Sequence, residues 1–157
     1  MGHEMNLSEA ELNAWQSMLM AHGRVVGRLD ADLINECDMT LAEYEVLHNL
    51  AVPADERIRM NELADRARLS PSGLTRRFDA LVRRGWVVRE RCDDDRRGVY
   101  ARITPDGTAR LETARPVHDR GVRTYFFEQL EPEDVACLDR AMSVVAEANS
   151  PRQFARD

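Results

Sequence analysis

The hydrophobic period of this chain changes abruptly at Gly85, from that of a helix to that of a strand. Before this glycine, apolar residues recur at the three- and four-residue spacing of a helix with one buried face. They are Leu74, Phe78, Leu81 and Val82. Ser70 is a good N-cap, and Pro71 fits the first helical position, where its missing N–H costs nothing. The sequence therefore predicts a helix from Pro71 to about residue 84.

The period after Gly85 is that of β-strands. The stretches 86–91 and 99–103 are rich in β-branched and aromatic residues and nearly alternate, and the polar segment 92–98 lies between them. This pattern predicts a β-hairpin. A shorter helix is expected over 61–68, with Leu63, Ala64 and Ala67 facing inward. Together these elements form a helix-turn-helix followed by a two-stranded wing.

Helix-start signals organise the rest of the chain. Ser8 with Glu11, and Thr40 with Glu43, form capping boxes that start helices over about 9–35 and 41–51. A helix from about 105 to 128 and a final helix from Pro132 follow the hairpin. We expect a mainly α (α+β) fold in four parts: an N-terminal dimerisation helix (1–38), a winged helix-turn-helix domain (39–104), C-terminal dimerisation helices (105–149) and a flexible tail (150–157).

The distribution of charge along the chain is uneven. The 157 residues carry a net charge of −6, which taken alone argues against a nucleic-acid partner. Between residues 57 and 103, however, 13 Arg stand against 7 Asp and Glu, a local net charge of +6. A basic middle between acidic ends is typical of a polyanion-binding module carried on another framework. Clustering on solvated helix faces is the alternative explanation.

Other classes of protein have little support in the sequence. Three widely spaced cysteines form neither a disulfide framework nor a CxxC motif, and the four histidines lack metal-ligand spacing. The sequence contains no GxGxxG, GxxxxGK[ST], HExxH or GxSxG motif. No apolar run approaches the ~20 residues that span a bilayer, and residues 1–11 are polar. We therefore expect a cytoplasmic protein that is not an enzyme, uses no cofactor or metal and has no membrane partner.

The predicted helix over 71–84 has the surface that DNA contact requires. Opposite its apolar face lie small, polar or basic residues: Ser72, Gly73, Thr75, Arg76, Asp79 and Arg83. Small residues let the helix N-terminus approach base edges, and Arg76 can donate two hydrogen bonds to guanine. On the wing, Asp95 can pair with Arg97 and hold it for entry into a narrow minor groove. An exposed surface helix and a weak surface ion pair are the alternatives.

In these segments the chain resembles the MarR family of winged-helix transcription regulators. The resemblance rests on five segments in order: the helix 41–50, Asn61-Glu62-Leu63-Ala64 leading into 70–76, then 81–89, 93–97 and 103–107. Two positions depart from the family pattern. Met60 stands where a hydroxyl N-cap is usual, and Asp94 lies at the wing tip.

The resemblance implies a homodimeric regulator, and we expect a repressor, that binds double-stranded DNA. The family's DNA-facing residues map to Ser70, Ser72, Gly73, Thr75, Arg76, Asp95 and Arg97. Independently of the family, the terminal helices carry more apolar surface than one small module can cover. On the C-terminal side these apolar residues are Leu111, Val117, Val122, Tyr125, Phe126, Phe127 and Leu130. Two-fold symmetry then predicts a pseudo-palindromic site with half-sites ~10 base pairs apart.

The resemblance also implies a possible small aromatic or anionic effector in the crevice between the dimer helices and the winged module. Trp15, Glu45, Arg77 and Arg89 are the expected lining residues. This set is similar to that of the urate-responsive branch of the family, which has Asp where this chain has Glu45. The alternatives are that Trp15 belongs to the core and that Glu45 and Arg77 form a structural ion pair.

Two further hypotheses remain open at this point. The family also uses cysteine oxidation as a switch, and the thiols here are Cys37 in an acidic loop, Cys92 at the wing and Cys137 on an apolar helix face. Alternatively, the winged helix could bind protein instead of DNA. That function would require an apolar surface on the helix over 71–84, whereas Ser, Thr and Arg occupy it.

Overall fold

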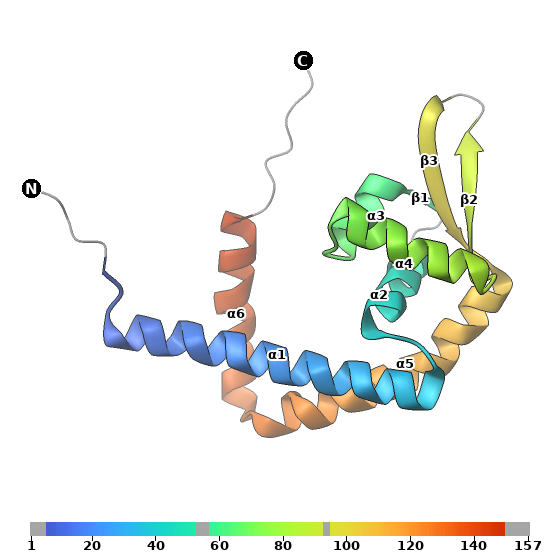
Figure 1. Cartoon of the computed structure of the whole chain (residues 1–157). Coiled ribbons are helices and arrows are strands. Elements are labelled where there is room, and N and C mark those ends of the chain that lie inside the picture. The colour runs from blue at the N-terminus through green and yellow to red at the C-terminus, as the bar shows by residue number, and fades with distance from the viewer. Residues whose placement is uncertain (1–5, 53–56, 93–94, 150–157) are drawn as a thin grey trace, which may run out of the picture.

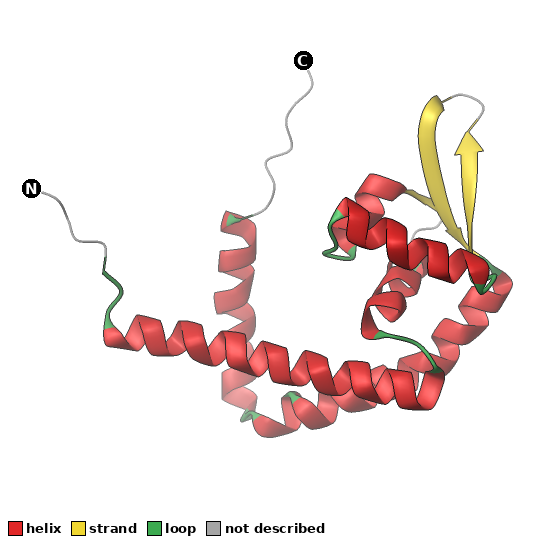
Figure 2. Cartoon of the chain, in the orientation of Figure 1, coloured by secondary structure: helices red, strands yellow, loops and turns green. Residues whose placement is uncertain are grey.

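The computed structural model describes residues 6–52, 57–92 and 95–149, with backbone alone at 91, 92 and 95–98. Helix dominates, and the strands are confined to one corner (Figure 2). The elements in order are α1 (Glu9–Cys37), α2 (Leu41–Ala51), β1 (Arg57–Arg59), α3 (Met60–Arg66), α4 (Pro71–Arg83), β2 (Val87–Cys92), β3 (Asp95–Ile103), α5 (Pro105–Tyr125), the 3-10 helix η1 (Phe127–Gln129) and α6 (Pro132–Ala148).

The predicted caps are present at the helix starts. Both capping boxes are complete: Glu11 reaches back to the backbone N–H of Ser8, and Glu43 reaches back to that of Thr40. The hydroxyl of Ser70 accepts a hydrogen bond from the backbone N–H of Gly73 and so caps α4. These side chains satisfy N–H groups that have no partner within the helix, and for this reason the capping residues predicted where the helices begin.

The sheet has one strand more than the sequence predicted. Its order is β1-β3-β2 and both pairings are antiparallel, with Ile58 of β1 opposite Ala101 of β3. The wing strands also reach nearer the tip than expected, since β3 already begins at Asp95. Segment 57–59 has a single apolar residue, too short a pattern to predict a strand, and it pairs only because β3 is adjacent.

The core lies where α2, α3, α4 and the sheet meet α5. Its largest fully buried side chains are Phe78, Leu33, Met39, Leu47, Leu50, Leu63, Leu74, Leu81 and Leu111. Two expectations were wrong here. Val82 is 37% exposed and so does not belong to the buried face of α4, whereas Leu111 and Val117 belong to this core and are not surplus apolar surface. Residue 82 lies at the edge of the α4 stripe, which the core covers only in part.

Helix α1 lies along α5, and Figure 1 shows its N-terminal half extending beyond the body of the chain. Polar pairs join the two helices: the hydroxyl of Tyr125 donates to the carboxylate of Asp32 at 2.6 Å, and Arg120 pairs with Glu36. The N-terminal half of α1 carries exposed apolar residues, namely Leu12, Trp15, Met18, Leu19 and Met20. Helix α6 contains no buried residue. Among the described residues, no helix has the length and apolarity needed to cross a membrane.

Candidate nucleic-acid interface

The N-terminal turn of α4 presents short polar side chains on an exposed surface. Ser70, Ser72 and Thr75 are exposed, and the Ser70 hydroxyl is held at 3.1 Å by the N–H of Gly73. The Thr75 hydroxyl donates to the carbonyl oxygen of Pro71 at 2.9 Å. These local bonds fix the side chains close to the backbone, so the helix end can approach another molecule closely.

Gly73 is required by the cap itself. A Cβ atom built at this position would lie 2.9 Å from the Ser70 hydroxyl oxygen and 3.4 Å from a guanidinium nitrogen of Arg77. The first distance is too short for a real contact, so a side chain at position 73 would displace the capping hydroxyl. A small residue at this point therefore serves both the close approach of the backbone and the stability of α4.

Two arginines of α4 differ in exposure although they are adjacent. Arg76 is exposed, whereas Arg77 is half-buried and donates to the carbonyl oxygen of Gly73 at 3.2 Å. Both line a cleft of about 390 Å³ between α4 and the junction of α1 with α2, together with Asp30, Thr40, Ala42, Glu43 and Ala80. Arg76 can thus extend outward from the polar end of α4, whereas Arg77 is turned toward the body of the chain.

The wing stands beside α4, which places both elements at the same end of the molecule (Figure 1). Asp95 and Arg97 lie at the start of β3. Their side chains are outside the described part of the structure, so the predicted pairing of Asp95 with Arg97 stays a prediction. The strand that carries Arg97 is nevertheless paired with β2 up to Asp95 opposite Cys92.

Asp79 lies on the outer side of α4 as the sequence suggested, with its side chain 44% exposed, and it also connects α4 to the wing. Its carboxylate lies 2.7 Å from the guanidinium of Arg89 on β2, and the same guanidinium is 5.0 Å from the centre of the Phe78 ring. The pair is partly exposed, and it offsets the one acidic charge on this part of α4.

A model of the MarR family matches residues 38–98. A MarR family transcriptional regulator from Streptomyces coelicolor, solved in complex with DNA, is 34% identical and superposes with a TM-score of 0.87, covering 97% of this chain and 96% of that chain. The chain belongs to the MarR family of transcriptional regulators.

Other known regulators match over shorter stretches or at lower identity. AbsC, also from Streptomyces coelicolor, is 33% identical with a TM-score of 0.83, covering 91% of this chain and 96% of that chain. The multiple antibiotic resistance protein MarR of Escherichia coli is 29% identical over 118 residues, 75% of this chain and 81% of that protein. The transcriptional repressor YetL of Bacillus subtilis is 33% identical over 76 residues, 48% of this chain and 46% of that protein.

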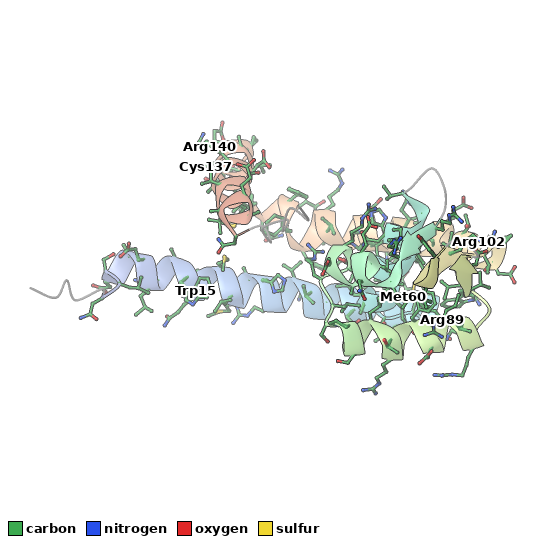
Figure 3. The ribbon with its side chains drawn as sticks, turned by 90° about the horizontal axis from the view of Figure 1, so that it is seen from above. Trp15, Met60, Arg89, Arg102, Cys137 and Arg140 are labelled. Atoms are coloured by element: carbon green, nitrogen blue, oxygen red, sulfur yellow. The ribbon has the colours of Figure 1, made fainter. Side chains whose placement is uncertain are left out.

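The four residues expected to line an effector site in this MarR family chain are dispersed. Trp15 is 54% exposed on the outer half of α1, and Figure 3 shows it far from Arg89. Glu45 pairs with Arg68 at 2.9 Å, so it does not form the ion pair with Arg77 that the sequence suggested as an alternative. Glu45 and Arg77 line two different clefts, and Trp15 is not part of the core.

The cleft that includes Glu45 has an aromatic wall and a cationic rim. It measures about 340 Å³ between α2, the end of α3 and α5, and its lining residues are Tyr44, Glu45, His48, Asn49, Arg66, Arg68, Arg115, His118 and Asp119. The Tyr44 ring stacks on His118 with ring centres 4.4 Å apart and on His48 at 5.9 Å. Burial, more than the nearby charge of Asp119, raises the pKa of the Tyr44 hydroxyl, so this group is a neutral donor.

Little in the sequence predicts this cleft. Arg68 has φ 54°, a left-handed conformation between α3 and α4, and this conformation accompanies its pairing with Glu45, 23 residues earlier. Nothing in the local sequence marks a non-glycine residue for that conformation. The stacking of Tyr44 with His118 also joins residues far apart in the chain, which no spacing rule detects.

The thiols differ in their surroundings. Cys37 is the last residue of α1 and is buried, not part of an acidic loop, and its burial raises the pKa of the thiol above its usual value. Cys137 is exposed on α6, 3.6 Å from a guanidinium nitrogen of Arg140 (Figure 3). The side chain of Cys92 lies outside the described part of the structure. A raised pKa opposes thiolate formation, so Cys37 is a poor redox sensor.

The departure at Met60 has a local consequence. Helix α3 begins at Met60 after Arg59, and no side chain caps its first turn. Met60 packs against the core instead, as a partly buried neighbour. The N-cap position of α3 is therefore Arg59, and Met60 is the first helical residue and not the cap that the sequence comparison expected.

Proposed function

We propose that this chain is a sequence-specific DNA-binding regulator that acts as a repressor, and that α4 and the wing contact the DNA. The observation that carries the proposal is the exposed, short and polar N-terminal turn of α4, ending in Arg76. The DNA complex of the regulator from Streptomyces coelicolor, which superposes over nearly the whole chain, supports it. The resemblance to the repressor YetL supports the repressor role.

The functional unit of this proposal is a homodimer. The outer half of α1 exposes Trp15, Leu19 and Met20, and α6 exposes Val144 and Val145 while burying none of its residues. A single chain therefore leaves two helices with apolar side chains in water, which a second copy would cover. In this arrangement segments 1–38 and 105–149 form the dimer, and the two winged domains (39–104) contact half-sites ~10 base pairs apart.

Selection of bound duplexes from a random DNA pool, followed by fluorescence anisotropy on the recovered site, tests the proposal. Arg76→Ala is expected to weaken binding to that site by ~1–3 kcal/mol or to relax its sequence preference, as loss of a base contact would. Arg123→Ala, at an exposed position of α5 outside α4 and the wing, is the matched control; it should bind as wild type, and sedimentation of the variant checks that the dimer is kept. Recovery of no enriched sequence would contradict sequence-specific binding.

The wing has a separate signature. Arg97→Ala should weaken binding across sequences and reduce the slope of log affinity against log salt by about one unit, since one phosphate or groove contact is lost. An unchanged slope and affinity would remove the wing from the mechanism.

Sedimentation of the free chain tests the dimer, and a monomer at micromolar concentration would contradict the pseudo-palindromic site.

We further propose that the cleft between α2 and α5 holds a small aromatic anion that releases the DNA. The Tyr44 ring offers a stacking surface, and the rim carries Arg66, Arg68 and Arg115 against the carboxylates of Glu45 and Asp119. An anionic ring would compete with Glu45 for Arg68, whose left-handed backbone lies two residues before the N-cap of α4. That exchange links occupancy of the cleft to the position of α4.

Titration of the protein–DNA complex with benzoate, 4-hydroxybenzoate and urate tests the effector, with neutral benzamide as the matched ligand. Anions should release DNA at concentrations where benzamide does not, and Arg115→Gln should raise the concentration required. Arg24→Gln, which lines a different cleft between α1 and α5, should leave it unchanged. Equal effects of all four compounds, or none, would contradict an anion site here.

A further inference from the structure

Arg84 joins the end of α4 to the end of α1. Arg84 is the C-cap residue of α4, and Asp38 is the C-cap residue of α1 in a left-handed conformation with φ 50°. One guanidinium nitrogen donates to the backbone carbonyl oxygen of Asp38 at 2.5 Å, and another lies 3.5 Å from its carboxylate. A backbone carbonyl moves only with its helix end, so this contact couples two helices and not merely two side chains.

The guanidinium is itself held in place by an indole ring. Its central carbon lies 4.7 Å from the centre of the Trp86 ring, and Trp86 is buried. Arg110 of α5 also lies over this ring, at 5.3 Å. Stacking on a fixed ring restricts the rotamers of Arg84, so less conformational entropy is lost when it bonds to Asp38. Contact between two ordered groups transmits position better than a mobile surface ion pair does.

The consequence rests on the proposed function, in which α1 packs against a second copy and α4 contacts DNA. The angle between α1 and α4 within each chain then sets the distance and rotation between the two α4 helices. One extra base pair between half-sites moves them apart by about 3.4 Å and rotates them by about 35°. A dimer in which this angle is fixed therefore accepts one spacing between half-sites, whereas a dimer in which the angle varies accepts several spacings.

We propose that Arg84 is a positioning residue that determines which half-site spacing the dimer accepts. Its contact with Asp38 fixes the C-terminal end of α4 against the C-terminal end of α1. A second contact, between the backbone N–H of Leu41 and the carboxylate of Asp30 at 2.7 Å, fixes the start of α2 against α1. Loss of Arg84 leaves that second contact in place, so the angle between α4 and α1 becomes more variable while α2 stays attached to α1.

The test uses duplexes that carry the selected site with its half-sites moved closer or farther by one and two base pairs. Wild type should discriminate strongly between the preferred spacing and its neighbours. Arg84→Gln should reduce that discrimination by about three- to tenfold, as expected for loss of one partly exposed hydrogen bond, while binding to the preferred spacing changes less. Arg84→Lys, which keeps the charge and one donor, should recover part of the discrimination.

Arg110→Gln is the matched control, because it removes a guanidinium from the same ring and leaves the bond of Arg84 to the Asp38 carbonyl oxygen in place. It should keep the spacing preference of wild type, and thermal unfolding of each variant reports on folding. Equal loss of affinity at every spacing for Arg84→Gln, or equal broadening by Arg110→Gln, would overturn the role of Arg84. Absence of wild-type binding to every duplex would instead overturn the proposed function and this role with it.

Discussion

The guanidinium of Arg89 on β2 lies 2.7 Å from the carboxylate of Asp79 on α4, and this ion pair joins the wing to the helix proposed to contact DNA. The guanidinium also lies over the Phe78 ring, so it is directed toward the helix by two neighbours. Asp79 would otherwise present a negative charge beside a surface that approaches phosphates. The ion pair thus has two effects: it orients strand β2 against α4, and it offsets the negative charge of Asp79.

Removal of Arg89 should harm DNA binding more than removal of both partners. Arg89→Gln leaves the Asp79 carboxylate uncompensated near the DNA, whereas the double variant Asp79→Asn with Arg89→Gln does not. Because both side chains are about one-third or more exposed, the cost in folding stability should stay below about 1 kcal/mol in either case. Anisotropy titrations of the two variants at low and moderate salt measure the difference. Equal affinities would show that Asp79 is too far from the DNA to matter.

Two substitutions at Ser70 should separate stability from function. Ser70→Ala removes the cap of α4 and should lower the free energy of unfolding by about 1 kcal/mol. Ser70→Asp keeps a capping oxygen and adds a charge that the helix N-terminus favours, so stability should be retained. The same charge should repel phosphate and weaken DNA binding. Urea denaturation and DNA titration of both variants test this, and normal DNA binding by Ser70→Asp would place Ser70 away from the interface.

Gly107→Ala should be strongly destabilising. A Cβ atom at this position would lie 2.1 Å from the carbonyl oxygen of Trp86 and 2.9 Å from a side-chain carbon of Ile103. The start of α5 would have to move away from the wing, and overpacking of this kind costs about 1–3 kcal/mol or more. Ala109→Ser, at an exposed position of the same helix, is the control and should cost roughly half a kcal/mol. A thermal unfolding midpoint for Gly107→Ala equal to that of the control would contradict the close contact.

The bond between Tyr125 and Asp32 should make stability fall at alkaline pH. The hydrogen bond that the Tyr125 hydroxyl donates to the Asp32 carboxylate raises the pKa of this hydroxyl above its ordinary value of 10.0, and burial adds a smaller effect in the same direction. A group whose pKa is raised on folding stabilises the protein below its unfolded pKa, and that stability is lost as pH rises through the folded value. Wild type should therefore lose stability more steeply than Tyr125→Phe above about pH 10. Parallel slopes for the two chains would show that the bond is absent in solution.

Most of the fold could be predicted from the sequence because its signals are local. The capping residues Ser8, Thr40 and Ser70 satisfy N–H groups within their own first turns, so a short sequence pattern reports them directly. The apolar spacing of α4 placed Leu74, Phe78 and Leu81 in the core for the same reason. Strand β1 was missed because three residues with one apolar member carry too little pattern.

The candidate interface was predictable in part. That α4 presents Ser72, Thr75 and Arg76 outward follows from helical periodicity once its apolar face is known. Periodicity cannot say which outward residue finds a partner on another element, so the ion pair of the partly exposed Asp79 with Arg89 was not predicted. The effector residues are not brought together within one chain, because Glu45 and Arg77 line separate clefts on either side of α2, so their shared site stays a prediction.

The helices, the wing and the polar face of α4 follow from local sequence, because each depends on residues close together in the chain. The contacts between distant segments appear only in the folded chain: Arg84 with Asp38, 46 residues apart, and Tyr44 against His118. Such contacts depend on the packing angles of whole helices, to which many side chains contribute at once. These are also the contacts on which the proposed spacing preference and effector cleft depend.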